Sequence, residues 1–553
     1  MTLTYSIQPL PFSTSFGEVV FVCCLIVFYL CTLTPLQASI MSSGGDTTGH
    51  ETTRDDVAHR EKPRRQQDEL SIIPEEFDTE EEERLVKKLD RFIMPIMAIV
   101  YFFQYIDKNS INYTSVFGLK SDLKLTDRDF SWAVSLFYVG QLVSQYPAAY
   151  ILSRFHITRF IGATIIICGI VEMCIGASSD FEGLATCRLL LGLAQAAVSP
   201  AFIILTSNWY RQHEHPMRVA TWISMNGISQ ITGGLLMYSL GDLEMSVPSW
   251  RVVFLVFGAL TILFGALFVV MMPVDTATAW FLNKREREVA TRRLAMDRVT
   301  CDKANFDYQQ LREALCSPLS WLYFFMAYYI ASANPITKYS SMVIDGVGFS
   351  RSDSMLVGLP AGLLNFITSW VAALVPQFFP NTRIYTAICL ILIPLAGSIM
   401  LFVFSSQTNG TYSWGIVVST WLATCYTAPL CSCAGLLASN VKGNTKKNIV
   451  GAGFFVAYSI GSIIAPQMWG TSGDTRYLTG CTFTIVNWSF LMILLIAYLV
   501  IIKRENKTRD CRAAGRRTNL GVAGPGGRDD ALIDVSEDSD LTDSQDKEFR
   551  YSM

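Results

Sequence analysis

Long apolar stretches alternate with short polar ones along the chain from residue 92 to residue 502. A helix needs about 20 mainly apolar residues to cross a bilayer, because lipid offers no partner for an exposed backbone amide. The pattern therefore predicts an all-α membrane protein with twelve transmembrane helices. The predicted spans are residues 92–114, 130–152, 158–178, 183–207, 219–240, 251–272, 318–340, 354–379, 383–404, 413–437, 448–469 and 480–502.

The spans form two sets of six, separated by a basic, polar segment from residue 273 to 317. We predict an N-terminal six-helix bundle over 92–272, a linker over 273–317 and a C-terminal six-helix bundle over 318–503. A 6+6 arrangement commonly binds its substrate near the bilayer midplane, between halves that rock against each other.

The regions outside the spans are polar, with one exception. Residues 41–91 and 504–553 have the low hydrophobicity of disordered tails. Residues 19–33 are apolar, but this run is short for a span and no basic residues precede it, as a signal peptide would require. Residues 1–40 are therefore interpreted either as an extension upstream of a true start at Met41 or as a thirteenth, weakly anchoring span.

Composition supports the membrane interpretation, because only 16% of the residues are charged, against about 25% in a soluble protein. Most of the 14 cysteines fall inside predicted spans, where a thiol behaves as a small hydrophobic group. We predict no metal, no cofactor and no nucleic-acid partner. The partners that we do predict are membrane lipid, protons and a small-molecule substrate.

Lysine and arginine concentrate in alternate loops, which sets the predicted orientation. The basic loops follow the second, fourth, sixth, eighth, tenth and twelfth spans. Placing them in the cytosol puts both chain ends there, and the plasma membrane is the default location. The opposite loops would carry the glycosylation sequons at Asn112 and Asn409, although Asn112 lies close to the membrane.

Several segments together carry a family resemblance: YFFQYIDKNSINYTSVFGLKSDLKLT, FSWAVSLFYVGQLVSQYPAAYILSRF, CRLLLGLAQAAVSPAFIILTSNWY and SNVKGNTKKNIVGAGFFVAYSIGSIIAPQMW. The chain resembles the major facilitator superfamily over about residues 84–503, and more narrowly the anion:cation symporter family in its fungal allantoate permease branch. The resemblance implies a transporter and not an enzyme. Substrates in this branch include allantoate, ureidosuccinate, dipeptides, vitamin-like acids and thiamine.

The loop after the second span matches a superfamily motif whose charges hold the two bundles together on the cytosolic side. The matching residues are Ala149, Ser153, Arg154 and Arg159, and the acidic member of the motif is missing. Arg154 and Arg159 are therefore candidates for gating. The alternative is that they anchor the loop in the cytosol through their positive charge alone.

Charges inside spans are costly unless they are paired or face water, so they tend to be functional. Asp107 and Lys108 follow the apolar run FIMPIMAIVYFFQY and match an acidic-basic pair that family members carry in the first span. A buried carboxylate beside an amine can exchange a proton as its surroundings hydrate and dry. We predict proton coupling at Asp107 and substrate binding at Lys108. The alternative is that the pair only marks the extracellular end of the helix.

Arg188 opens the fourth span in the pattern RxxxG, which ends at Gly192. In the family this arginine takes part in gating or substrate coupling. Its guanidinium group can hold a carboxylate with two parallel hydrogen bonds, or pair with Asp107 when the site is empty. A purely structural ion pair is the competing interpretation.

Gln195 departs from the family pattern, because relatives commonly have a glutamate there that is thought to carry the coupling proton. Glutamine cannot ionise. The protein therefore couples through Asp107 alone, recruits Glu172 of the third span, or transports without a proton. We retain Glu172 as a proton-coupling candidate and Gln195 as a substrate-binding one.

Asn334 and Lys338 lie one helical turn apart near Pro335, which lacks a backbone donor and is predicted to kink the seventh span. Family members place polar groups against the substrate at this break. Lys338 can bind an anion there, or it can extend to the outer surface. Other polar residues that can line the cavity are Gln141, Gln145, Asn226, Gln230, Asn365 and Tyr426.

Together these patterns predict a monomeric secondary active transporter that imports a small organic anion with a proton by alternating access. One alternative is a nutrient-sensing receptor built on a transporter scaffold. Another is an uncoupled facilitator, which the glutamine at Gln195 favours. A membrane enzyme would need a cluster of histidines and carboxylates at one depth, and the chain has only five histidines.

Overall fold

The computed structural model describes residues 79–154, 156–211, 214–241, 246–298, 307–379, 381–406, 413–470, 477–520, 541–546 and 549–553. All regular secondary structure within these residues is helical, which confirms the all-α class. The extension over residues 1–40, most of the predicted tail over 41–91 and the sequon at Asn409 lie outside the described residues.

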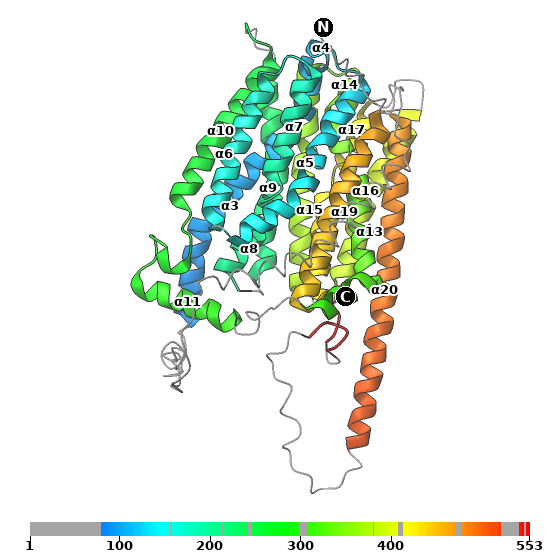
Figure 1. Ribbon diagram of the computed structural model, residues 1–553. Helices are drawn as coiled ribbons and strands as arrows, with labels where there is room; N and C mark the ends of the chain where they lie inside the picture. The colour runs from blue at the N-terminus through cyan, green and yellow to red at the C-terminus, as the bar shows by residue number, and fades with distance from the viewer. Residues whose placement is uncertain are drawn as a thin grey trace, which may run out of the picture. The chain divides into compact units, whose positions relative to one another are not determined.

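Helices lie at each of the predicted segments (Figure 1). The first group is α3 (Thr79–Thr114), α5 (Asp127–Arg154), α6 (Ile157–Gly176), α7 (Phe181–Gln195), α8 (Val198–Trp209), α9 (His215–Gly241) and α10 (Ser249–Met271). The second group is α13 (Pro318–Ser332), α14 (Ile336–Asp345), α15 (Arg351–Phe378), α16 (Arg383–Ser406), α17 (Ser413–Ala423), α18 (Thr427–Asn440), α19 (Asn444–Gly470) and α20 (Leu478–Leu520). A short π-helix, η1 (Ser115–Leu119), and α4 (Lys120–Asp122) follow α3.

Fewer helices than the predicted twelve are apolar enough to cross a bilayer by length and composition alone. The described residues contain nine, or ten if Tyr308–Cys316 and Pro318–Asp345, bent by 63°, count as one span. The long helices outside this count, α5 and α9, have 28 and 27 residues. They pack against α19 and α15 of the second group. Polar side chains are tolerated there, because they face other helices and not lipid.

Three of the predicted spans are interrupted. The break between α13 and α14 includes Pro335, as predicted, and α14 begins at the next residue. The interruptions between α7 and α8 and between α17 and α18 were not predicted. Each break is followed by a proline in the first turn of the next helix, Pro200 in α8 and Pro429 in α18, which cannot donate to the carbonyl four residues earlier.

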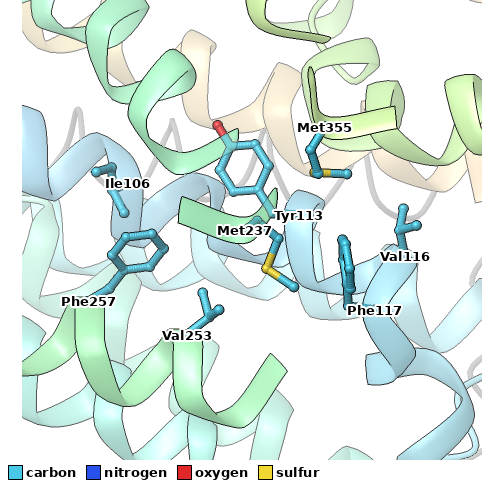
Figure 2. Packing of buried hydrophobic residues seen from close by; sticks show 8 residues of the cluster. All are labelled: Ile106, Tyr113, Val116, Phe117, Met237, Val253, Phe257 and Met355. Carbon is cyan, nitrogen blue, oxygen red and sulfur yellow. The ribbon is translucent and has the colours of Figure 1, made fainter. Parts of the chain in front are cut away.

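Close helix packing joins the two groups at a pair of glycines. A Cβ atom on Gly227 of α9 would lie 2.5 Å from the Gly362 carbonyl oxygen of α15, and one on Gly362 would lie 2.7 Å from the Gly227 oxygen. A larger residue at either position would push the helices apart. An apolar cluster beside this contact includes Tyr113, Met237 and Met355, and so joins α3 and α9 to α15 (Figure 2).

The segment between the groups contains α11 (Lys284–Arg298) and α12 (Tyr308–Cys316). We call the end of the helices beside this segment the linker end and the opposite end the distal end (Figure 1). Lys88 of α3 pairs with Glu286 of α11 at 2.7 Å, and Arg293 of α11 pairs with Glu214. These ion pairs fasten the linker to the first group.

The chain after residue 504 differs from the predicted disordered tail. Helix α20 continues to Leu520, and residues 541–546 and 549–553 pack on the linker end of the second group. The polar composition that suggested disorder instead supplies charged partners, such as Arg509 and Asp543, for contacts between these two parts.

Candidate functional site

Two neighbouring residues of α3 point to different surroundings. Successive side chains of a helix are about 100° apart, so Asp107 and Lys108 can face different neighbours. Asp107 is fully buried inside the first group. Lys108 is half-buried and lies beside aromatic rings from both groups.

Asp107 belongs to a buried charge cluster together with Glu172 of α6 and Arg188 of α7. The Thr261 hydroxyl of α10 lies 3.1 Å from both Asp107 carboxylate oxygens and donates to them. Asp107 interacts electrostatically with Glu172 and Arg188. The sequence therefore identified three residues that the fold brings together from three different helices.

The remaining members of the cluster have few hydrogen bonds. Among the described residues, neither Glu172 carboxylate oxygen accepts a hydrogen bond, and the nearby Ser110 hydroxyl donates instead to the Asp107 carbonyl oxygen. Arg188 donates one hydrogen bond to the Ser110 hydroxyl at 3.4 Å, and its guanidinium carbon lies 5.9 Å from the Phe254 ring centre. Two ionised carboxylates beside one guanidinium leave one uncompensated negative charge. Because such a charge is costly away from water, binding one proton would neutralise the cluster.

The Lys108 ammonium group lies between the two groups of helices. Its nitrogen is 5.0 Å from the Tyr138 ring centre and 5.8 Å from that of Phe137, both on α5, and 5.7 Å from that of Tyr458 on α19. No hydrogen bond or ion pair joins it to another described residue. Rings of this kind stabilise a cation without neutralising it, so the ammonium group can still attract an anion.

Further tyrosines connect to the rings beside this amine. Tyr105 of α3 is adjacent to Tyr426, and Tyr458 is adjacent to Tyr426 and Asn334. We call Lys108 with Tyr105, Tyr138, Tyr426 and Tyr458 the amine site. Hydroxyl groups can donate hydrogen bonds to an anion held by the amine.

Tyr105, Tyr138 and Tyr458 were not predicted from the sequence. A usable signal was present, because Tyr101, Tyr105 and Lys108 are spaced at i, i+4 and i+7 on one helix face. Aromatic residues are common in apolar spans, however, and the spacing alone does not separate a binding face from a packing face.

Lys338 is buried and does not extend to the outer surface. Its ammonium group donates to the Lys108 carbonyl oxygen at 3.0 Å and also to the Asn109 side chain. Lys338 thus ties α14 to α3 near the amine site. Asn334 is buried one turn away, and its side-chain oxygen accepts a hydrogen bond from Thr337 at 3.0 Å.

Gln195 is buried and donates from its side-chain amide to the Gln104 carbonyl oxygen at 3.3 Å. It therefore holds α7 against α3, outside both the buried charge cluster and the amine site. Arg159 is exposed in the first turn of α6. The Arg154 side chain lies outside the part of the chain that the structure describes.

Hydrogen bonds between the two groups of helices lie toward the distal end. The Asn112 amide donates to Ser340 at 3.1 Å, and Ser131 and Tyr339 share a hydrogen bond of 2.9 Å. The Asn112 side chain is thus buried and hydrogen-bonded, so it is not accessible for glycosylation. Toward the linker end, a Cβ atom on Gly451 of α19 would meet no atom within 4 Å.

A small cavity lies among these distal contacts. Its polar lining comes from both groups, with Asn112, Tyr113 and Gln230 from the first and Ser340, Ser341, Ser354, Thr420 and Trp421 from the second. It has no charged lining residue. Among the described residues, no cluster of histidine, cysteine and carboxylate side chains could hold a metal ion.

Comparisons with known proteins identify the class to which this fold belongs. Residues 97–466 match the model of the Major Facilitator Superfamily. The chain therefore belongs to this superfamily of multi-span membrane transporters, which are not enzymes.

Individual relatives agree with this assignment. A Schizosaccharomyces pombe protein described as an uncharacterized transporter, C757.13, is 31% identical over 86% of this chain and 88% of its own length. The Saccharomyces cerevisiae allantoate permease is 26% identical over 94% of both chains. The crystal structure of a D-xylose-proton symporter has the same fold, with a TM-score of 0.55 and 12% identity over 72% of this chain and 96% of that one.

Proposed function

We propose that the chain imports a small organic anion together with a proton. The observation that carries the proposal is the placement of two neighbouring charges on α3. Lys108 lies between the two groups of helices, whereas Asp107 lies in the buried charge cluster. The amine site would bind the anion, and the buried charge cluster would bind the proton.

Alternating access provides the mechanism in this proposal. The two groups of helices act as six-helix bundles, over residues 92–272 and 318–503, that rock about the amine site. Distal hydrogen bonds such as Asn112 to Ser340 would break when the site opens to the other side. Arg154 and Arg159 would then meet the second bundle as the linker end closes.

The proposed substrate is a carboxylate-bearing nitrogen compound similar to allantoate or ureidosuccinate, or a vitamin-like acid. Likeness to a permease for allantoate supports this class, as does an amine that lies beside tyrosine rings from both groups of helices. The proposed orientation places the linker end in the cytosol, because basic residues concentrate in the linker. We propose the plasma membrane as the location and a monomer as the working unit.

An uncoupled facilitator is the second candidate. It is favoured by Gln195, which cannot ionise and which is already used to bind the Gln104 carbonyl oxygen. In a facilitator, the charge state of the buried cluster would not change during transport.

Uptake by cells that lack their own permeases distinguishes the two. The panel would contain labelled allantoate, ureidosuccinate and vitamin acids, each measured at acidic and neutral pH with and without a protonophore. Proton symport predicts accumulation that is greater at acidic pH and collapses with the protonophore. Equilibration that ignores both conditions would show a facilitator, and surface-expressed protein that moves no compound on the panel would contradict the proposed substrate class.

A further inference from the structure

Residues 541–546 and 549–553, which we call the docked segment, lie on the linker end of the second group of helices (Figure 1). They contact α12, the end of α18, the start of α19 and α20. These contacts combine ion pairs, backbone hydrogen bonds and aromatic packing, and they are independent of both sites described above.

A buried ion pair and an aromatic ring anchor the docked segment. Asp543 is buried, and its carboxylate lies 2.6 Å from the Lys446 ammonium group and accepts a hydrogen bond from the Tyr551 hydroxyl at 2.8 Å. Arg509 of α20 lies over the Tyr551 ring, 4.8 Å from its centre. Arg509 also donates to the Asp543 and Phe549 carbonyl oxygens at 2.8 and 2.9 Å.

Two asparagine side chains bind the backbone of the docked segment. Asn506 accepts from the Tyr551 amide at 3.1 Å and donates to the Tyr551 carbonyl at 2.9 Å. Asn440 does the same for Ser552, at 2.7 and 2.9 Å. Paired recognition of backbone donors and acceptors is how proteins hold an extended peptide. The second group therefore holds Tyr551 and Ser552 through their backbone.

Ser544 occupies an exposed position at the edge of this surface. Its hydroxyl donates to one Glu313 carboxylate oxygen at 2.6 Å, and Thr542 donates to the other at 2.8 Å. Partial burial raises the pKa of Glu313, but hydrogen bonds from Lys446, Ser544 and Thr542 outweigh this effect and lower it below 4.5. Glu313 is consequently negative at neutral pH, directly opposite the Ser544 hydroxyl.

We propose that the surface is a regulated docking site for the chain's own docked segment, and that phosphorylation of Ser544 releases it. A protein kinase would transfer the terminal phosphoryl group of a nucleoside triphosphate to the serine oxygen, with the diphosphate leaving and the hydroxyl proton passing to the kinase. The modified oxygen then cannot donate to Glu313. It carries instead a phosphate with about −1.5 to −2 charges, which the carboxylate repels.

Release would loosen the joint between the linker and the second group. Lys446 lies in the first turn of α19 and pairs with both Glu313 of α12 and Asp543 of the docked segment. Docking thus adds a second ion pair to Lys446 at the point where α12 meets α19. The proposal rests on the proposed function only in requiring that the linker end faces the cytosol, where kinases act.

Hydrogen exchange of the full chain in lipid nanodiscs tests the docking. The variants are Ser544→Asp, the size-matched neutral Ser544→Asn, a chain with phosphoserine incorporated at 544, and Ser544→Asp combined with Glu313→Gln. We expect slow exchange of the Tyr551 and Ser552 amides in the unmodified chain, and exchange about tenfold or more faster with aspartate or phosphoserine. The asparagine variant should stay within about threefold of the unmodified chain, and Glu313→Gln should restore protection to the aspartate variant.

Two outcomes would overturn the proposal at different steps. Exchange in the unmodified chain as fast as in a free peptide of the same sequence would show that the segment does not dock. Equal exchange in the aspartate and asparagine variants would show that charge does not release it. Mass spectrometry of chain purified from nutrient-rich and starved cells should find phosphate on Ser544, and its absence from both would exclude the modification. None of these measurements depends on the transported substrate.

Discussion

The two sides of α3 differ in what surrounds a charge. Asp107 lies among groups from α6, α7 and α10, all in the first group of helices. Lys108, the next residue, has aromatic neighbours from both groups, and its ammonium group has no hydrogen-bonding partner among the described residues. A charge enclosed within one group of helices suits proton binding, whereas a charge between the two groups suits a ligand that must be released when they part.

The two proposed sites can be coupled through α3 without direct contact. A small shift or rotation of α3 changes both environments together, because both residues are on the same helix. Lys338 strengthens the connection, since it holds α14 to the Lys108 backbone. Protonation of the buried charge cluster and occupation of the amine site would then favour the same movement of α3.

The largest expected effect comes from removing the amine. Lys108→Gln should reduce anion uptake about 100-fold, because a desolvated charge-assisted contact contributes about 2–5 kcal/mol. Uptake of a labelled anion by cells with matched surface expression measures it. Lys120→Ala, which removes a lysine paired with Asp127 at the distal end, is the matched control and should transport normally. Normal uptake by Lys108→Gln would show that the amine site does not bind the transported anion.

Asp107→Asn tests proton coupling at one side of α3 without removing the amine that binds the anion at the other. The substitution keeps the shape and an acceptor for Thr261 but removes the charge that a proton would neutralise. With one proton per anion, a gradient of about one pH unit supports about tenfold accumulation of the anion. The variant should lose this accumulation but still exchange internal for external anion. Accumulation that still follows the pH gradient in the variant would place the proton elsewhere.

Gln195→Glu tests whether the missing family glutamate can be restored. A glutamate would face the Gln104 carbonyl oxygen and lack a donor unless protonated. We therefore expect a loss of about 1–3 kcal/mol in stability at neutral pH, a smaller loss at acidic pH, and a steeper pH dependence of uptake. Thermal unfolding in detergent at the two pH values measures the first effect. Equal stability at both would show that the new side chain turns away from Gln104.

Removing one hydroxyl from the amine site should have the smallest effect. Tyr458→Phe keeps the ring beside Lys108 but removes a neutral hydrogen bond of about 0.5–1.5 kcal/mol. Apparent affinity should fall about two- to tenfold with little change in maximal rate. Tyr323→Phe is the control, since its hydroxyl bonds Leu436 and Tyr498, both inside the second group. An equal effect in both variants would indicate a general packing defect.

Much of the fold follows from the sequence because apolar length and spacing are local properties. The positions of the spans and the break at Pro335 were readable from residue order alone. The break between α7 and α8 also had a local signal that was overlooked, because Pro200 in the first turn of α8 cannot donate a hydrogen bond to the Ala196 carbonyl oxygen.

The site was predictable to the extent that buried charges are rare. Asp107, Glu172 and Arg188 stood out for this reason, and the fold brings them together. The role of Lys338 was not readable, because its partner is a backbone carbonyl 230 positions away. The docked segment was missed for a related reason, since its polar composition resembles disorder until Arg509, Lys446 and Asn440 are placed opposite it.

The most direct test of the account is proton movement driven by the anion. Purified protein in liposomes that contain a pH-sensitive dye would be given allantoate, or the anion identified by uptake, without an imposed gradient. The account predicts internal acidification that depends on the anion, is lost in Asp107→Asn, and is lost together with anion binding in Lys108→Gln. Anion entry without acidification in the unmodified protein would contradict proton symport and establish a facilitator instead.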